Sequence, residues 1–206
     1  MNRTLSFYNN SAKDGFLVIS QFAPVEGEPV FVWLTKYANP GGRVQFTWTN
    51  DYAFVWSDTG TLVPGVVVTT GQLLPTTLHG QNMVTFVYDA AVESFKFVDQ
   101  GDGQGGGRFF IRCNETIVPG MASVGLAQSG APVRLMPANP QMTYVFEPPM
   151  NTYFVGFGQG AERPYVVANT FAPFEKIDWQ MNIAKMDATL NADGSWKIEP
   201  THLLAE

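Results

Sequence analysis

Apolar and polar residues alternate with a period of two along much of the chain, a pattern typical of β-strands that bury one face. Val44, Phe46 and Trp48 alternate with polar residues, for example. Several segments share the pattern: 44–48, 84–88, 95–97 and 144–146. The alternation therefore predicts strands that each have one face in a core and one face in solvent.

Three further runs, 15–20, 30–34 and 65–68, are apolar at almost every position. We interpret them as strands that are covered on both faces or lie at an interface. Turn-forming residues separate the runs, and Asp193-Gly194 predicts a tight hairpin. Helical periodicity is absent from the chain, and 175–185, the segment closest to it, predicts a short helix at most. Short strands with turns between them favour an all-β fold of antiparallel β-sandwiches.

Two segments of the chain, 38–60 and 138–160, look like copies of one unit. They align without a gap and agree at 7 of 23 positions, where chance gives about one or two. The similarity extends outward: 15–21 matches 122–128, 64–68 matches 164–168, and 94–97 matches 195–198. We infer an internal duplication, with offsets that drift as loop lengths change.

The duplication predicts two tandem β-sandwich units with a pseudo-twofold relation. The first repeat is expected at 1–98 and the second at 108–206, with matching strands up to about residue 200. Between them, 99–107 is the most glycine-rich stretch of the chain and is expected to be a flexible linker. Comparison of the two copies also acts as an internal control. Residues that are identical in both copies are assigned to the scaffold, and residues present in only one copy are candidates for function.

The amino-acid composition indicates a folded chain with few charged residues. Of its 206 residues, 45% are hydrophobic, 14% aromatic and 15% charged, the opposite of a disordered chain. The formal net charge is −6 and the basic residues form no cluster, which argues against nucleic acid and anionic membranes as partners. No apolar run reaches the roughly 20 residues of a membrane span.

The residues that usually carry metal or thiol chemistry are few. Cys113 is the single cysteine and is expected to be a small buried residue, since His79 and His202 are the only histidines and show no cysteine-protease context. Asp99 and Asp102 supply too few acids for a calcium loop. We therefore expect no metal, no cofactor and no catalytic residue, and predict that the protein is not an enzyme.

The stretch 46–66 carries a family resemblance. It contains an aromatic strand, Asp51-Tyr52, Phe54-Val-Trp56, Asp58-Thr-Gly60 and Leu62-Val-Pro-Gly-Val66 in that order. This order resembles the RhiA-type proteins, a bacterial family associated with expression in the rhizosphere, and 122–130 resembles the second half of that family. The resemblance spans most of the chain and implies family and fold, because no established biochemical activity comes with it.

The candidate site residues are Asp51, Tyr52, Trp56 and Asp58, all in the first copy. The aligned residues of the second copy are Asn151 for Asp51, Gly156 for Trp56 and Gly158 for Asp58. Two readings of the acids remain: a carboxylate pair for glycoside hydrolysis, or residues that order turns, and the second is favoured. The aromatic residues Trp33, Trp48, Tyr52, Phe54 and Trp56 similarly fit either a sugar-stacking platform or the core, and the alternation places Trp48 in the core.

These features favour a non-enzymatic binding or self-assembling β-sandwich protein, expected to form a homo-oligomer. A glycan or another surface ligand is the expected small partner. The alternatives are a membrane-active protein of the β-sandwich toxin type and a carbohydrate-binding lectin. The N-terminal segment shows no signal-peptide core, so a cytoplasmic location is expected, with leaderless export as the other route.

Overall fold

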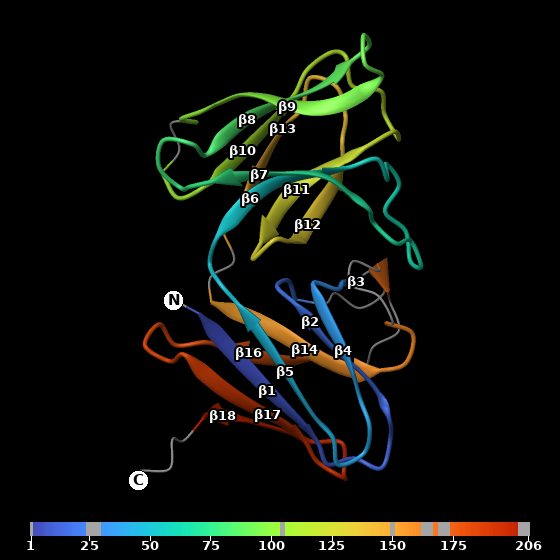
Figure 1. The fold of residues 1–206 in the computed structure, drawn as a ribbon, viewed down its shortest axis with the longest axis vertical. Coiled ribbons are helices and arrows are strands. Elements are labelled where there is room, and N and C mark those ends of the chain that lie inside the picture. The colour runs from blue at the N-terminus through green and yellow to red at the C-terminus, as the bar shows by residue number, and fades with distance from the viewer. Residues whose placement is uncertain are drawn as a thin grey trace. The chain divides into compact units, whose positions relative to one another are not determined.

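The computed structural model describes residues 2–23, 30–103, 106–148, 151–161, 167–168 and 174–201. The described part of the chain is all-β, as predicted, with four four-stranded sheets and one two-stranded sheet (Figure 1). Within it, no helix has the length and apolar character needed to cross a membrane. The strands divide into two compact units, and each unit is built on a pair of four-stranded sheets.

The first unit combines residues 1–50 with 150–206. One of its sheets has the order β18-β17-β1-β5 and the other has the order β16-β14-β2-β4, and a two-stranded sheet pairs β15 with β3. The strands of this unit are β1 (Arg3–Asn9), β2 (Gly15–Ser20), β3 (Val30–Phe31), β4 (Leu34–Ala38), β5 (Arg43–Trp48), β14 (Thr152–Gly158), β15 (Val167–Ala168), β16 (Glu175–Asp178), β17 (Lys185–Leu190) and β18 (Trp196–Pro200).

The second unit is the continuous segment 51–149. Its sheets have the orders β13-β10-β8-β9 and β12-β11-β6-β7. Its strands are β6 (Tyr52–Ser57), β7 (Thr70–Thr76), β8 (Met83–Asp89), β9 (Ser94–Gly101), β10 (Phe109–Cys113), β11 (Ser123–Gln128), β12 (Ala131–Pro137) and β13 (Thr143–Phe146).

The division differs from the expected tandem halves 1–98 and 108–206, although the number of units agrees. Strands from both ends of the chain pair within the first unit, β1 with β17 in parallel and β2 with β14 antiparallel. In the second unit β8 pairs with β10 in parallel and β6 with β11 antiparallel. Strand β9 also continues to Gly101, so the first residues of the predicted linker 99–107 belong to a strand.

The two units have the same topology. Each contains one sheet with a central parallel pair, β17-β1 or β8-β10, and one sheet whose described pairs are all antiparallel. Strands β1, β2, β4 and β5 take the places that β10, β11, β12 and β13 take in the second unit, and β14, β16, β17 and β18 take those of β6, β7, β8 and β9. This correspondence is compatible with the duplication expected from the sequence.

Several local predictions can be compared with these strands. The run 15–20 is a strand covered on both faces, since Val18 packs with Val32 and Ala161 while Leu17 and Ile19 are also fully buried. The predicted hairpin at Asp193-Gly194 is confirmed as the β17–β18 connection. The strand predicted over 65–68 was wrong, since Gly65 lies in a turn and Val67 forms only an isolated bridge. The segment 175–185, expected to be a short helix at most, begins as strand β16.

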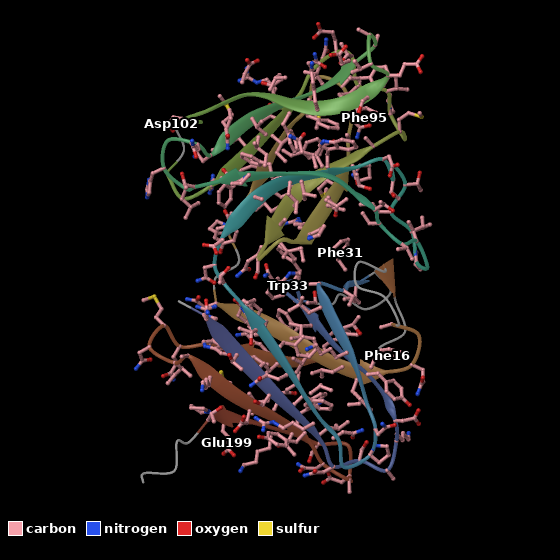
Figure 2. All side chains as sticks on the ribbon, in the orientation of Figure 1. Phe16, Phe31, Trp33, Phe95, Asp102 and Glu199 are labelled. Carbon is pink, nitrogen blue, oxygen red and sulfur yellow. The ribbon has the colours of Figure 1, made fainter. Side chains whose placement is uncertain are left out.

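Aromatic rings fill the core of the first unit (Figure 2). Trp33 and Trp48 are fully buried, and both rings contact Tyr153, at centroid distances of 6.0 and 5.1 Å. The Tyr153 hydroxyl accepts hydrogen bonds from Arg3 Nη1 at 2.6 Å and from Trp48 Nε1 at 3.1 Å. Asn151 accepts a further hydrogen bond from the Arg3 guanidinium. The one hydroxyl therefore satisfies two buried donors from β1 and β5.

The core of the second unit is built mainly from phenylalanine. Phe54 lies between Phe97 and Phe109, at centroid distances of 6.1 Å to each, and all three side chains are buried. Cys113 is also buried, as predicted, and burial raises the pKa of its thiol to about 11.

The hydroxyl of Tyr153 gives a test of this core. We expect Tyr153→Phe to lower the free energy of unfolding by about 1–3 kcal/mol, because Arg3 and Trp48 lose a buried acceptor. The matched control is Tyr144→Phe, whose hydroxyl bonds to Pro137 on an exposed edge of the second unit and is expected to cost about 0.5 kcal/mol. Urea unfolding of both variants measures the difference, and equal stability for the two would contradict the network.

Candidate functional site

The acidic pair predicted from the sequence does not converge. Asp51 and Asp58 stand at opposite ends of β6 and are both exposed. A strand rises about 3.3 Å per residue, so seven residues place the two carboxylates roughly 23 Å apart. Paired carboxylates in glycoside hydrolysis are about 5–10 Å apart. The structure therefore does not form the glycosidase pair from these residues.

Trp56 is half-buried and points into the second unit. Its ring contacts Phe86 and Phe95 of the opposite sheet at 6.1 and 5.8 Å, and its Nε1 donates to Gln72 at 3.1 Å. Gly71 lies under the ring, where an added Cβ would be 2.2 Å from it. Trp56 is thus held by packing on several sides.

The structure also corrects the counterpart of Trp56, which the gapless alignment placed at Gly156. Phe54 and Trp56 face the core on β6, whereas Tyr153 and Phe157 face it on β14. Because successive residues of a strand point to opposite faces, a shift by one residue exchanges the two sets. Trp56 therefore corresponds in position to Phe157, and an aromatic residue stands there in both units.

The other aromatic candidates do not form a surface platform. Trp33, Trp48 and Phe54 are all 1% exposed or less. Tyr52 is half-buried and packs against the ring of Phe109 at 5.3 Å. A sugar-stacking platform made of these residues is therefore wrong, because their faces are covered by their own cores.

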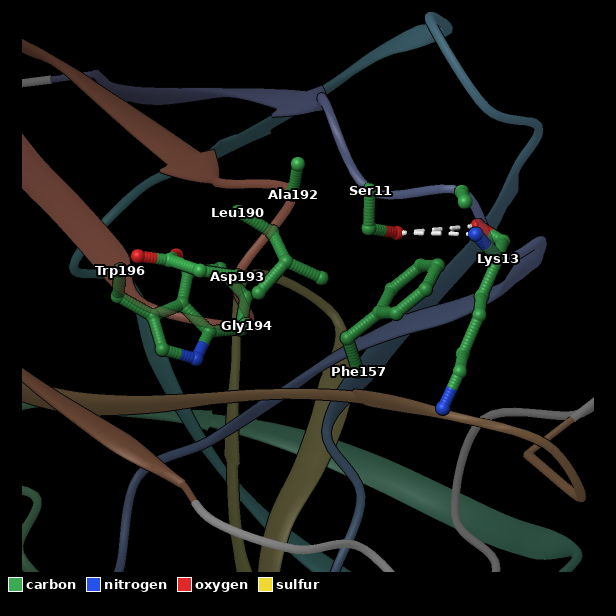
Figure 3. A pocket seen from close by; sticks show the side chains of 9 residues that line it. Ser11, Lys13, Phe157, Leu190, Ala192, Asp193, Gly194 and Trp196 are labelled. Carbon is green, nitrogen blue, oxygen red and sulfur yellow. Dashed lines mark hydrogen bonds between the residues drawn. The ribbon is translucent and has the colours of Figure 1, made fainter.

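A different pair of aromatic residues borders a pocket of about 340 Å³ in the first unit (Figure 3). Three segments surround it: the loop after β1, the inward face of β14, and the hairpin between β17 and β18. The lining residues are Ser11, Ala12, Lys13, Phe157, Leu190, Ala192, Asp193, Gly194 and Trp196.

The parallel pairing of β1 with β17 explains why these segments meet. Parallel strands end at the same edge of a sheet, so the loop after β1 and the hairpin after β17 emerge side by side. Asn10 N–H donates to the Leu190 carbonyl at 2.9 Å and joins the two exits directly. Ser11 and Asp193 thus reach one pocket although they are far apart in the sequence.

The aromatic walls of the pocket rest on one buried ring. Phe7 is fully buried and contacts Phe157 at 5.5 Å and Trp196 at 5.7 Å. Phe157 and Trp196 are each half-buried, and Figure 3 shows Leu190 between them. The walls therefore combine apolar ring surface with a fixed spacing.

The loop after β1 is held by a buried asparagine. Asn9 is fully buried, and its Nδ2 donates to the carbonyl of Lys13 at 2.7 Å. Its Oδ1 accepts from the hydroxyl of Ser11 at 2.6 Å and from the Ser11 N–H at 3.1 Å. These bonds fix the backbone that carries the Ser11 and Lys13 side chains at the pocket.

Charge at the pocket comes from Lys13 and Asp193. Asp193 Oδ1 accepts two hydrogen bonds from Ser195, one from its hydroxyl at 2.6 Å and one from its backbone N–H at 2.9 Å. These two bonds hold the pKa of Asp193 below its ordinary value. Asp193 is thus ionised at neutral pH. The pocket therefore combines aromatic surface, a hydroxyl and one charge of each sign.

These pocket residues were missed by reasoning from the sequence. The Asp193-Gly194 turn was found, and Trp196 follows it, but no spacing motif links Trp196 to Lys13 or Phe157. Groups of three or more histidine, cysteine, aspartate or glutamate residues that could hold a metal ion are absent from the described part of the chain.

Comparison with known proteins gives a family. The chain is 25% identical to "Protein RhiA" of Rhizobium leguminosarum bv. viciae over 203 residues, which is 96% of this chain and 86% of that protein. No solved structure shows significant similarity to the chain. The RhiA family model matches residues 1–201, nearly the whole length, and the chain therefore belongs to the RhiA family.

Proposed function

We propose that this member of the RhiA family is a non-enzymatic binding protein whose ligand enters the pocket between Trp196 and Phe157. The ligand class that best fits the lining is a sugar residue or a similar small molecule with an apolar face and a polar edge. The volume of about 340 Å³ is at the lower end for small-molecule sites, which suits a single ring rather than an extended ligand.

The observation that carries the proposal is the support of both aromatic walls by Phe7. The Phe157 and Trp196 rings are positioned before a ligand arrives, so little ordering is needed on binding. Tryptophan and phenylalanine faces pack against the apolar face of a sugar, while Ser11, Lys13 and Asp193 can bond to its hydroxyls.

Two features support a role without catalysis. Asp51 and Asp58 are too far apart to act together, since β6 separates them. The thiol of Cys113 is buried and its pKa of about 11 keeps it protonated near neutral pH, where a nucleophile needs the thiolate.

Glycan binding gives the direct test. We expect the protein to bind a subset of a glycan array, and Trp196→Ala to weaken that binding at least tenfold because one aromatic wall is lost. The matched control is Phe95→Ala, an aromatic residue of the second unit on the second strand of the corresponding hairpin, β9, which should leave binding unchanged. Circular dichroism establishes that both variants fold.

Binding to none of the glycans, or equal loss in the two variants, would contradict the sugar proposal. In that case a fragment screen by NMR, followed at the Trp196 indole signal, decides whether the pocket takes another class of small molecule. An indole signal that no fragment moves would contradict binding at this pocket altogether.

The charge of Asp193 should persist to low pH. Because the Ser195 bonds depress its folded-state pKa, they contribute stability above the ordinary aspartate value near 3.9, and that contribution is lost as the pH falls through the lowered pKa. NMR titration of the Asp193 carboxyl carbon should give a pKa below 3.9. In Ser195→Ala we expect the value to rise, and an unchanged value would mean that these bonds do not set it.

Self-association stays a second expectation, and one apolar region favours it. Val63, Val118 and Met121 are 47%, 56% and 56% exposed, and they lie on two loops of the second unit that meet at Gly60 and Gly120. We expect light scattering to show a homo-oligomer whose mass falls in Met121→Lys. A monomer at high protein concentration would contradict this expectation.

A further inference from the structure

Each compact unit contains one half of each sequence repeat. In the first unit, β1 to β5 come from the first repeat and β14 to β18 come from the second. In the second unit, β6 to β9 come from the first repeat and β10 to β13 come from the second. The arrangement is reciprocal: the first unit holds the first half of repeat one and the second half of repeat two, and the second unit holds the remaining two halves.

Hydrogen bonds at equivalent places support the equivalence of the halves. Asn9 N–H donates to the Gly42 carbonyl at 3.0 Å, and Cys113 N–H donates to the Met142 carbonyl at 2.8 Å. The turns that follow β4 and β12 each place one residue at positive φ, Gly41 at 71° and Gln141 at 59°. The sequence alignment pairs residue 41 with 141 and 42 with 142.

The bonds that cross between repeats also recur. Asn10 N–H donates to the Leu190 carbonyl in the first unit, and Asn114 N–H donates to the Phe86 carbonyl in the second, at 2.9 and 3.1 Å. Each bond joins a β1-type strand of one repeat to a β17-type strand of the other. The same interface is therefore made twice with the repeats interchanged.

The chain passes between the units at matching points of the two repeats. It leaves the first unit after residue 50 and returns to it after residue 149. The gapless alignment pairs 50 with 150, so the two crossings fall within one residue of each other in the repeat. Only residues 49–51 separate β5 from β6, and Pro148-Pro149 precedes β14. A connection as short as 49–51 favours exchange over folding back.

We propose that the two repeats have exchanged halves within one chain, so that the protein is a single-chain equivalent of a strand-exchanged dimer. Each repeat then has the other repeat as its binding partner. The interface consists of β1 on β17 and β2 on β14 in one unit, and of β8 on β10 and β6 on β11 in the other. The covalent link between β9 and β10 is not needed to hold the repeats together.

The strand pairs distinguish exchanged from unexchanged repeats. Ala53 lies opposite Ala127 of the other repeat, and Ser20 lies opposite Phe154 of the other repeat. Without exchange, β2 would pair with β6, and Ser20 would face Ala53. Opposite residues of antiparallel strands are about 4.5–5.5 Å apart at Cα, within the range that a disulfide spans.

The test uses the full chain with a protease site inserted between Gly106 and Gly107, which are exposed. We expect the cleaved protein to elute in native buffer at the mass of the uncut chain. Separation of the two fragments in native buffer would overturn the proposal. As a control, the thermal unfolding of the uncut variant is compared with that of the natural protein. Equal unfolding temperatures show that the insertion leaves the fold intact.

Two cysteine pairs in this cleavable chain locate the contacts. After oxidation and cleavage, Ala53→Cys with Ala127→Cys should run as one band near 22.7 kDa without reductant and as two bands of about half that mass with it. The second pair, Ser20→Cys with Ala53→Cys, lies within one fragment and is therefore read by alkylation and mass spectrometry. Both of its thiols should stay free, because the two residues lie in different units. Cys113 is buried and stays out of the reaction.

Two bands without reductant for the Ala53 and Ala127 pair, together with a disulfide in the Ser20 and Ala53 pair, would overturn the proposal and show unexchanged repeats. The oxidised Ala53 and Ala127 pair is also run before cleavage, where a band of twice the chain mass would overturn the single-chain arrangement, since the halves would then be exchanged between copies.

Discussion

The pairing of strands from opposite ends of the chain is the constraint on which the rest of the structure depends. Strands β1 and β17 lie side by side in parallel although Thr4 and Lys185 stand near the two ends of the chain. The second unit repeats this arrangement with β8 and β10. In both units the parallel pair is at the centre of its sheet, so its loss would divide the sheet in two.

The candidate binding pocket follows from the same pairing. Parallel strands bring their following loops to one edge, and this places Ser11 and Lys13 beside Asp193. In the second unit, Trp56 occupies the place of Phe157 and its ring contacts Phe95 directly. The two units therefore share a scaffold and differ in how aromatic residues fill the end of the sandwich.

Much of the strand content could be predicted from the sequence, because alternation reports which face of a strand is buried. The strand predicted at 65–68 failed because a short apolar run is compatible with more than one local structure. The alignment of Trp56 with Gly156 failed for another reason. Identical residues in two aligned strands do not show which face of the sheet each side chain is on. A shift of the alignment by one residue moves every side chain of the strand to the opposite face.

Two features could not be predicted from one sequence in physical terms. A repeat has the same sequence whether it pairs with itself or with its neighbour, so the exchange of halves leaves no mark in the residues. The pocket likewise joins Lys13, Phe157 and Trp196, which have no common motif. The candidates Asp51 and Asp58 drew attention because they occur in one copy, yet their positions at the two ends of β6 separate them.

The exchange of halves is the central claim, and interstrand nuclear Overhauser effects in the intact, uniformly labelled protein test it most directly. The account predicts backbone contacts between Ser20 and Phe154 and between Ala53 and Ala127. Backbone contacts between Ser20 and Ala53 would instead place both halves of one repeat in the same unit and would contradict the account.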